Sequence, residues 1–555
     1  MKTKIIFLFL VFTALIGCED ILDTSPKGVL VEGTLASAEA VDKLVIAAYQ
    51  GLGAHFLGNA EAFAGPSSNW IIDVRSDDAY KGGGGITDRT DIHQLETATI
   101  FPDNYATFQK WRNNMFAIAR CNLAMREIEK LEDPNYAKEQ RIAEMRLLRG
   151  HFFFDLKRNF DQIPYFDEND DPTKISNKDY TSDEVWDLIE ADFQYAFDNL
   201  PLQQPDIGRV NKYIAAAYLA KINIERKEWD AAITHCDFVM GGPYALFSEF
   251  ENISKVEYEN GSEVVFAAQY STANIYANHN WGNLLNVTLG PGIDNGAYAN
   301  GDDFYHGSQN LVNAYRTDDN GLPLFNSFDD EVVADGNYSG TLDPRLDHTF
   351  GRIGIPWKGT AIYSEAWMRS TDYLGYSSKK HVVAPDHPDI HNSFPWAASG
   401  LNFMFIRYAE VLLWKAEALI ESDAQQDLNE ARTLINQVRE RAMNSAYVQK
   451  LDGSGDAANY LIGPYPGSGW NQEYARMALR FERRLELAME GHRFYDLNRW
   501  NITAEVMNDY YASEAARVSY LGEATFIEGT HEYLPIPQDE IDLAPELYFQ
   551  NNGYN

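Results

Sequence analysis

Cysteine is scarce in this sequence, with only three residues in a chain of 555. Cys18 lies near the beginning of the chain, whereas Cys121 and Cys236 lie in apolar stretches with helical spacing. Two cysteines in such positions do not supply a disulfide framework or a zinc site. We therefore expect Cys121 and Cys236 to be buried free thiols.

Basic residues are also few. The chain has 46 Lys and Arg and 82 Asp and Glu, which gives a formal net charge of −36 at pH 7. Nucleic acids bind proteins through Lys and Arg contacts to their phosphates, so this balance argues against a nucleic-acid partner. It argues equally against a ligand that carries many negative charges. A neutral ligand is the natural inference.

Long apolar runs are absent after the first segment of the chain. The run from Ile5 to Ile16 is too short to span a bilayer, which needs about 20 residues, and it fits the apolar part of a signal peptide. It ends in Leu15-Ile16-Gly17-Cys18, which resembles the cleavage box of bacterial lipoproteins. We expect residues 1–17 to be removed and Cys18 to carry acyl chains that anchor an otherwise soluble body. The alternative is an ordinary secretory signal with a chance cysteine.

Motifs of known catalytic chemistry are missing as well. There is no G-x-S-x-G and no H-E-x-x-H, and no Gly-Lys-Ser/Thr follows the glycines 82–85. A pair of carboxylates, as glycoside hydrolysis needs, is inevitable among 82 acids and is therefore uninformative. The acidic run 167–171 lacks the spacing of a calcium-binding EF-hand loop and favours a solvated loop. We expect no catalytic residue, no cofactor and no metal site.

What the sequence does contain is a series of paired amphipathic helices. Alanines at their contact positions predict tetratricopeptide-like packing, although no strict repeat can be written. We predict a mostly α fold, an α-solenoid-like scaffold of helix pairs with a large loop-rich insertion and few short strands. The predicted helices span 108–131, 141–154, 183–200 and 211–226, one opening at 229 and one at 402, then 427–442 and 475–500.

The helical pattern is interrupted for about 160 residues, which are rich in Gly, Asn, Asp, Tyr and Trp. Long segments without regular structure tend to be functional in compact proteins. We therefore expect residues 18–555 to form one domain. Its scaffold lies mainly in 36–240 and 402–500, its binding insertion in 241–401 and an extended tail in 501–555.

Six segments in this order resemble the SusD/RagB family of nutrient-binding outer-membrane lipoproteins, and together they cover nearly the whole chain. They are the box ending at Cys18 with Glu19-Asp20-Ile21-Leu22-Asp23 behind it, Arg75-Ser76-Asp77-Asp78-Ala79-Tyr80-Lys81, residues 146–164 from Arg146-Leu147-Leu148-Arg149-Gly150-His151, residues 407–418 from Arg407-Tyr408-Ala409-Glu410, residues 482–500 from Glu482-Arg483-Arg484-Leu485-Glu486, and residues 534–554 from Leu534-Pro535-Ile536-Pro537.

The resemblance implies four tetratricopeptide-like helix pairs with a loop-rich face that binds ligand. It also implies an outer-membrane position facing the cell exterior and a partner, a SusC-like TonB-dependent transporter. Family ligands are mostly oligosaccharides, although some members bind peptides. Ile16 replaces the commoner small residue of the lipoprotein box.

The predicted binding residues are aromatics in loops, with polar neighbours that suit sugar hydroxyls. Sugar rings stack their C–H faces on Trp and Tyr, whereas hydroxyls pair with carboxylates and amides. Alternatively, the aromatics form a satellite core beneath a long loop, and the two aspartates cap a turn. The recurrent Arg, Glu and His of 146–151 and 483–499 are interpreted as scaffold contacts. The candidates are Trp70, Asp77, Asp78, Trp281, Asn283, Tyr298, Trp357, Trp367, Tyr376 and Trp396.

Overall fold

The computed structural model describes residues 37–53, 64–273, 280, 286–290, 301–391 and 398–554. Five of the residues singled out above lie outside these ranges: Cys18, Trp281, Asn283, Tyr298 and Trp396. The predicted signal peptide lies outside them too. No helix of the described part is both long and apolar enough to cross a membrane.

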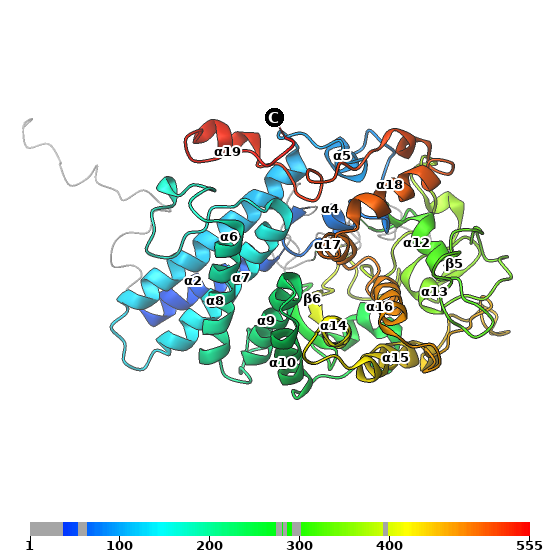
Figure 1. Cartoon of the computed structure of the whole chain (residues 1–555), viewed down its shortest axis with the longest axis horizontal. Helices are drawn as coiled ribbons and strands as arrows, with labels where there is room; N and C mark the ends of the chain where they lie inside the picture. Colours follow the sequence, from blue (N-terminus) through cyan, green and yellow to red (C-terminus); the bar gives the residue numbers. More distant parts are fainter. Residues whose placement is uncertain are drawn as a thin grey trace, which may run out of the picture.

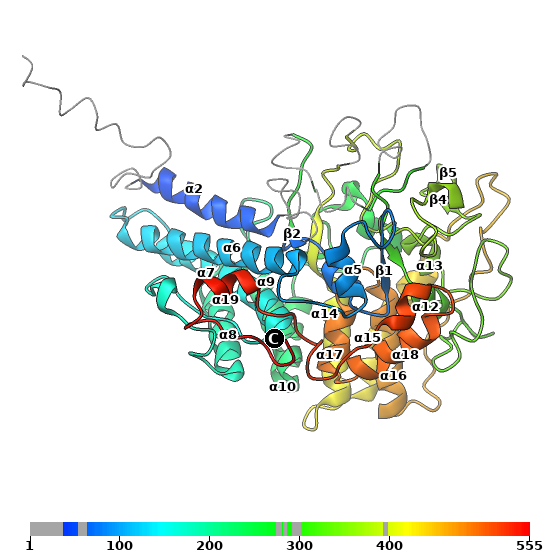
Figure 2. The same cartoon turned by 90° about the horizontal axis from the view of Figure 1, so that it is seen from above.

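Long helices packed side by side make up one half of the molecule (Figures 1 and 2). Consecutive helices from α6 to α10 contact one another, α10 packs on α14, and α14 contacts α15 and α16. This arrangement confirms the predicted helix-pair scaffold. The scaffold helices are α2 (Ala38–Tyr49), α6 (Tyr105–Lys130), α7 (Lys138–Phe160), α8 (Ser182–Asn199), α9 (Lys212–Arg226), α10 (Trp229–Met240), α14 (Tyr408–Glu421), α15 (Leu428–Asn444) and α16 (Gln472–Glu486).

Capping side chains determine where several of these helices begin. At α8, the Thr181 hydroxyl accepts the Glu184 amide at 3.3 Å, and the Glu184 carboxylate accepts the Thr181 amide at 2.8 Å. Asn104 and Asn211 accept backbone amides at the starts of α6 and α9. These bonds satisfy amides that have no partner within the helix.

Small residues allow the scaffold helices to approach closely. Ala216, Ala217 and Ala220 of α9 are fully buried where this helix packs against its neighbours. Gly150 of α7 faces the ring of Phe193 on α8, and a Cβ atom at Gly150 would lie 2.6 Å from that ring. The alanine-rich pattern read from the sequence therefore marks helix contacts.

Within the described residues, the insertion contains short helices and contributes β2, β3, β4 and β5 to two-stranded antiparallel sheets, whereas β1 and β6 lie outside it. Strand β1 pairs with β3, β2 with β6, and β4 with β5. The remaining elements are α4 (Trp70–Asp73), β1 (Ala79–Gly82), α5 (Thr90–Glu96), β2 (Val264–Ala268), β3 (Phe304–Gly307), α12 (Gln309–Ala314), α13 (Arg345–Thr349), β4 (Pro356–Trp357), β5 (Ala361–Ile362), β6 (Phe403–Arg407), α17 (Arg493–Arg499), α18 (Thr503–Glu514) and α19 (Gln538–Leu543).

The helix predicted to begin at Asn402 begins at Tyr408 instead. Residues 403–407 form β6, which pairs with β2 and so joins the two ends of the insertion. Periodicity alone cannot separate a short apolar strand from the helix that follows it, because a buried strand and a buried helix segment have similar composition. Pairing with a distant segment decides the matter.

The C-terminal region also differs from the prediction. The helix expected over 475–500 breaks after Glu486, and Met489 and Gly491 there adopt left-handed backbone with φ of 63° and 78°. Beyond residue 501 the chain is not simply extended, because it forms α18 and α19. The end of the tail does lie on the scaffold, where the Leu534 amide donates to the Asn159 carbonyl at 2.7 Å.

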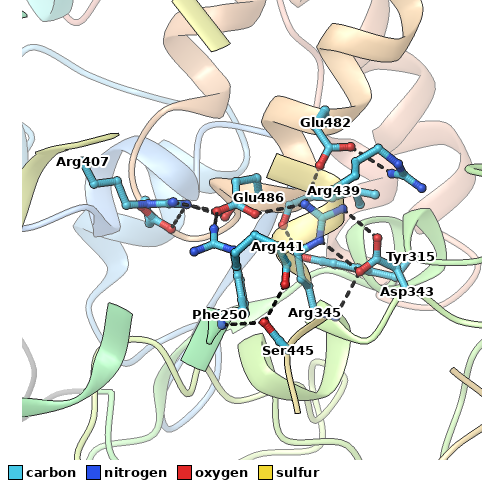
Figure 3. Close-up of polar contacts among 12 residues, drawn as sticks. Phe250, Tyr315, Asp343, Arg345, Arg407, Arg439, Arg441, Ser445, Glu482 and Glu486 are labelled. Atoms are coloured by element: carbon cyan, nitrogen blue, oxygen red, sulfur yellow. Dashed lines mark hydrogen bonds and ion pairs between the residues drawn. The ribbon is translucent and has the colours of Figure 1, made fainter. Parts of the chain in front are cut away.

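A buried network of ions joins the insertion to α15 and α16 (Figure 3). Arg345 pairs with Asp343 at 2.7 Å, Glu482 at 2.6 Å and Glu486 at 3.0 Å. Glu486 also accepts from Arg407 at 2.6 Å and from Arg441. Although burial acts in the opposite direction, these arginines hold the pKa of Glu486 well below its usual range. The motif that begins at Glu482 therefore connects the parts of the fold.

Candidate ligand-binding surface

A glycine corner, residues Gly82–Gly85, ends strand β1 beside the insertion. Gly82 and Gly83 have φ of 74° and 75°, and a Cβ atom at Gly83 would lie 2.3 Å from the Phe304 ring. Only glycine fits such a close approach in left-handed backbone. The Lys81 ammonium holds the loop by donating to the carbonyls of Gly82 at 2.9 Å and Gly85 at 2.8 Å.

Next to this corner lies a polar rim, which we define as Asp88, Asp302, Trp367 and Arg369. The Arg369 guanidinium donates to the Asp302 carbonyl at 3.0 Å and lies 3.4 Å from the Asp88 carboxylate. The three charged side chains keep about a third of their surface or more in solvent, at 33%, 42% and 32% for Asp88, Asp302 and Arg369. They can therefore offer both donors and acceptors to a polar ligand.

The aromatic member of the rim, Trp367, rests on a small second core. Its ring lies edge-on to Tyr363 at 5.2 Å and to Trp357 at 6.4 Å between centroids. Tyr363 and Trp357 are fully buried there, whereas Trp367 is half-buried. A ring held by buried neighbours and partly open to solvent is pre-positioned for stacking, so Trp367 stays a candidate contact.

Trp357 and Tyr376 do not lie on this surface, contrary to the prediction from sequence. Trp357 is 0% exposed and stacks on Tyr363 at 5.5 Å. Tyr376 is 3% exposed and donates its hydroxyl to the Gln309 side chain at 2.6 Å. Both rings are covered by protein, so they have no face free for a sugar in this structure. The satellite-core alternative holds for Trp357.

Trp70 belongs to the main core rather than to a loop surface. Its ring is 3% exposed and stacks on Tyr305 at 5.8 Å, with Phe304 at 5.5 Å. Residues 70–73 form α4, so the ring is carried by a short helix that packs inward. The polar residues around it in the sequence conceal this burial.

Asp77 and Asp78 are buried structural anions, which corrects their prediction as acceptors of sugar hydroxyls. Asp77 receives both Nε and an Nη of Arg493, at 2.8 and 2.9 Å, and Asp78 pairs with Arg484 at 2.8 Å. Burial would raise the pKa of Asp77, but Arg484 and Arg493 lower it to about 2. The pair therefore fastens the segment before β1 to α16 and to the start of α17.

Four predicted contacts, Trp281, Asn283, Tyr298 and Trp396, stay predictions because they lie outside the described residues. In contrast, Asp88, Asp302 and Arg369 were not predicted from the sequence. The pattern Trp367-Met368-Arg369 within a Ser- and Gly-rich segment was the available signal for Arg369. The two aspartates gave none, since isolated acids are common in this chain.

Titratable groups of the motif at 482–500 are engaged in structural contacts. His492 lies 3.2 Å from the Glu410 carboxylate, and burial lowers its pKa well below the usual value. Glu490 pairs with Lys380 at 2.6 Å and Arg407 at 2.7 Å. Cys121 and Cys236 are free and buried, as predicted. In the described ranges, no three His, Cys, Asp or Glu side chains gather as a metal site.

These features place the protein in the class of helical-repeat scaffolds that carry a large loop insertion. A model of the SusD family matches residues 262–554, and a second, described as starch-binding associating with outer membrane, matches residues 22–224. The chain belongs to the SusD/RagB family. The resemblance seen in the sequence motifs is thereby confirmed.

Curated relatives extend over the whole chain. The SusD-like protein P2 of Formosa agariphila is 25% identical, with 100% of each chain covered. A SusD-like protein of Bacteroides ovatus is 23% identical over 99% of this chain and 95% of its own. Full coverage at both ends shows that the scaffold and the insertion occur together in these relatives.

Solved structures share the fold. A laminarin binding SusD-like protein is 21% identical and superposes with a TM-score of 0.66, covering 93% of this chain and 99% of its own. Surface glycan-binding protein A from Bacteroides thetaiotaomicron, solved in complex with laminarihexaose, is 20% identical with a TM-score of 0.69 and the same coverage. At this identity the likeness concerns the fold.

Proposed function

We propose that this protein captures oligosaccharides at the cell surface and delivers them to a SusC-like TonB-dependent outer-membrane transporter. The observation that carries the proposal is the half-buried Trp367 ring, two residues before Arg369, whose guanidinium donates to the Asp302 carbonyl. Relatives that bind laminarin and laminarihexaose support a glycan as the ligand class. The transporter partner is tested by purifying this protein from detergent-solubilised outer membranes. If no transporter co-purifies under any condition, the delivery step is contradicted.

Membrane attachment through lipid on Cys18 is part of the same proposal. The sequence box before this residue supports it, and the family description names an association with the outer membrane. A Cys18→Ser variant should leave the membrane fraction and appear in the soluble fraction after cell breakage. Unchanged membrane retention would contradict lipid anchoring.

Two other functions compete with glycan capture. The same scaffold can serve peptides, and glycoside hydrolysis is a distant third. The three functions are distinguished by calorimetric titration of the lipid-free form, residues 19–555, with oligosaccharides and peptides. Each mixture is then analysed for cleavage products. Saturable glycan binding without products is the expected result. Binding of peptides alone would favour the second function, and product formation would favour the third.

Replacement of Trp367 by alanine tests the position of the binding surface. We expect Trp367→Ala to weaken glycan binding by about 1 kcal/mol or more, comparable with the loss of one stacked ring. Trp367→Phe should retain part of the affinity because it keeps an aromatic face. Phe116→Ala, at a ring that is 52% exposed on α6, is the matched control and should bind normally. Equal affinity of all the variants would remove Trp367 from the site.

A further inference from the structure

A separate groove of about 790 Å³ opens elsewhere on the insertion. Its walls come from the turns Phe250–Ser254 and Val256–Tyr258, from α13, from the β4–β5 turn and from residues 446–451 after α15. None of the four rim residues lines it. Its volume is within the range of sites that hold small ligands.

The groove is basic although the protein as a whole is strongly acidic. Lys255, Lys358, Lys379 and Lys450 all line it, in a chain with 82 acidic and 46 basic residues. With three carboxylates among the lining residues, the cavity has a small excess of basic groups, which is a local reversal of the overall charge balance. Such a reversal concentrates anions where the rest of the surface repels them.

The acidic groups of the groove are already paired. Glu251 forms an ion pair with Lys255, and Glu257 lies 3.0 Å from the His387 ring nitrogen. The Asp347 carboxylate accepts from Arg352 at 2.8 Å and from the Tyr460 hydroxyl at 2.6 Å. Glu251 and Asp347 therefore have cationic partners in Lys255 and Arg352. Lys358 forms no ion pair with a described residue, although the charge of Glu251 still acts on it.

Lys379 stiffens the floor of the groove beneath the β4–β5 turn. Its ammonium donates to the carbonyls of Asp347 at 2.7 Å and Pro356 at 3.0 Å, and it is 3% exposed. Carbonyl oxygens satisfy its hydrogen bonds but do not neutralise its charge. A positive potential therefore persists at the turn.

Lys358 occupies that turn and makes no hydrogen bond or ion pair with any residue that the structure describes. It is half-buried, and its backbone is left-handed with φ of 44°, a conformation that costs a lysine about 1 kcal/mol. Burial, reinforced by the charge of Lys379, lowers the pKa of Lys358 to about 7. A strained, desolvated cation next to another cation is stabilised by a bound anion.

The other walls of the groove suit a carbohydrate. Tyr258 is 42% exposed, Tyr447 is half-buried and Leu451 is 47% exposed along the same cavity. Aromatic and apolar surface of this kind can pack against the C–H face of a sugar ring. The groove therefore combines a stacking wall with the Lys358 ammonium group, which forms no ion pair with a described residue.

We propose that this groove is a second carbohydrate site that selects sugars bearing an oxyanion, a carboxylate or a sulfate ester, which the Lys358 ammonium receives. The carbohydrate part rests on the proposed function, whereas the anion part rests on the groove alone. The net negative charge of the protein does not prevent an anionic sugar from binding here, because only a short segment of the ligand enters this cavity. The inference of a neutral ligand, drawn from the net charge, then concerns the rim, whereas the groove binds an anionic sugar.

The test uses Lys358→Asn, which removes the charge and favours left-handed backbone, so the variant should fold at least as stably. Lys174→Gln is the matched control, since it removes one charge from a side chain that is 77% exposed. Hexagalacturonate, laminarihexaose and inorganic sulfate are titrated calorimetrically into all three proteins. We expect hexagalacturonate to bind the unmodified chain and Lys174→Gln, and to bind Lys358→Asn at least tenfold more weakly.

A second readout does not depend on affinity for a particular glycan. Reductive ¹³C-methylation of lysines gives each amine a resonance, and that of Lys358 is the one absent from Lys358→Asn. Movement of this resonance with hexagalacturonate supports a carboxylate ligand, and movement with sulfate alone supports a sulfate ester. No movement with either anion, or equal movement with laminarihexaose, would overturn the proposal. If laminarihexaose does not bind the unmodified chain but hexagalacturonate does, the rim is contradicted as a site for neutral glycans and the groove proposal stands.

Discussion

The aspartates between α4 and β1 show how neighbours decide the charge of a buried side chain. Asp77 faces two guanidinium groups, so it stays ionised in the interior. Among the residues that the structure describes, Asp73 forms no ion pair with a cation, and it accepts from the Tyr305 hydroxyl and, at 3.0 Å, from the Gly491 amide. Burial raises the pKa of Asp73 to about 8 from a model-compound value of 3.8. Residues of one type, four positions apart, thus carry different charges.

The raised pKa of Asp73 makes the stability of the protein depend on pH. The folded state binds a proton that the unfolded state releases above about pH 4, so the free energy of unfolding falls as pH rises towards 8. Asp73→Asn should reduce this slope by about 1.3 kcal/mol per pH unit between pH 5 and 7, where the folded group is protonated and the unfolded group is not. Urea unfolding at several pH values measures it, with the exposed Asp509→Asn as control. Equal slopes in all three proteins would contradict a protonated Asp73.

At the scale of elements, most long helices and the strand-like run at 263–266 were predictable, whereas the pairing of the strands was not. The helix over Ser182–Asn199 carries its own capping box and stop signal, so its bounds follow from local sequence. Strand β6 forms because β2 lies beside it, although the two are far apart in the chain. The contact between α7 and α8 was predictable only in part. A glycine in α7 indicates a close helix contact, but only the tertiary structure shows that α8 is the partner.

The contact between α7 and α8 should respond sharply to side-chain volume. Gly150→Val would force the first side-chain atom to within 2.6 Å of the Phe193 ring, which is fully buried. We expect a loss of about 1–3 kcal/mol in unfolding free energy, as for other overpacked cores. Gly241→Ala is the control, because its nearest neighbour would lie at 3.4 Å and its φ is −75°. A stability change within about 0.5 kcal/mol for Gly150→Val would contradict the close packing.

At the scale of the molecule, the buried ion network makes the insertion and the scaffold mutually dependent. Arg345 belongs to the insertion, whereas its partners Glu482 and Glu486 belong to α16 (Figure 3). Loss of one member leaves the others charged and buried, which costs about 3–5 kcal/mol. Neither part can therefore unfold without exposing charges of the other.

We expect the scaffold and the insertion to unfold in one transition. Far-ultraviolet circular dichroism follows the helices, and near-ultraviolet dichroism follows aromatic rings such as Trp357 and Tyr363 of the second core. The two midpoints should coincide, and Glu486→Gln should lower both together by at least several degrees. An insertion signal that melts first, with the helical signal unchanged, would contradict this coupling.

The sequence by itself determined the helical scaffold, the family and the buried free thiols, because these follow from local periodicity, composition and ordered motifs. The tertiary structure decided which candidate residues face solvent. Trp70 and Trp357 each have polar residues on one side in the chain, yet both rings are buried among aromatic neighbours. Asp77 is neutralised by Arg493, 416 positions away. Burial and ion pairing are properties of contacts between distant segments, so no local pattern contains them.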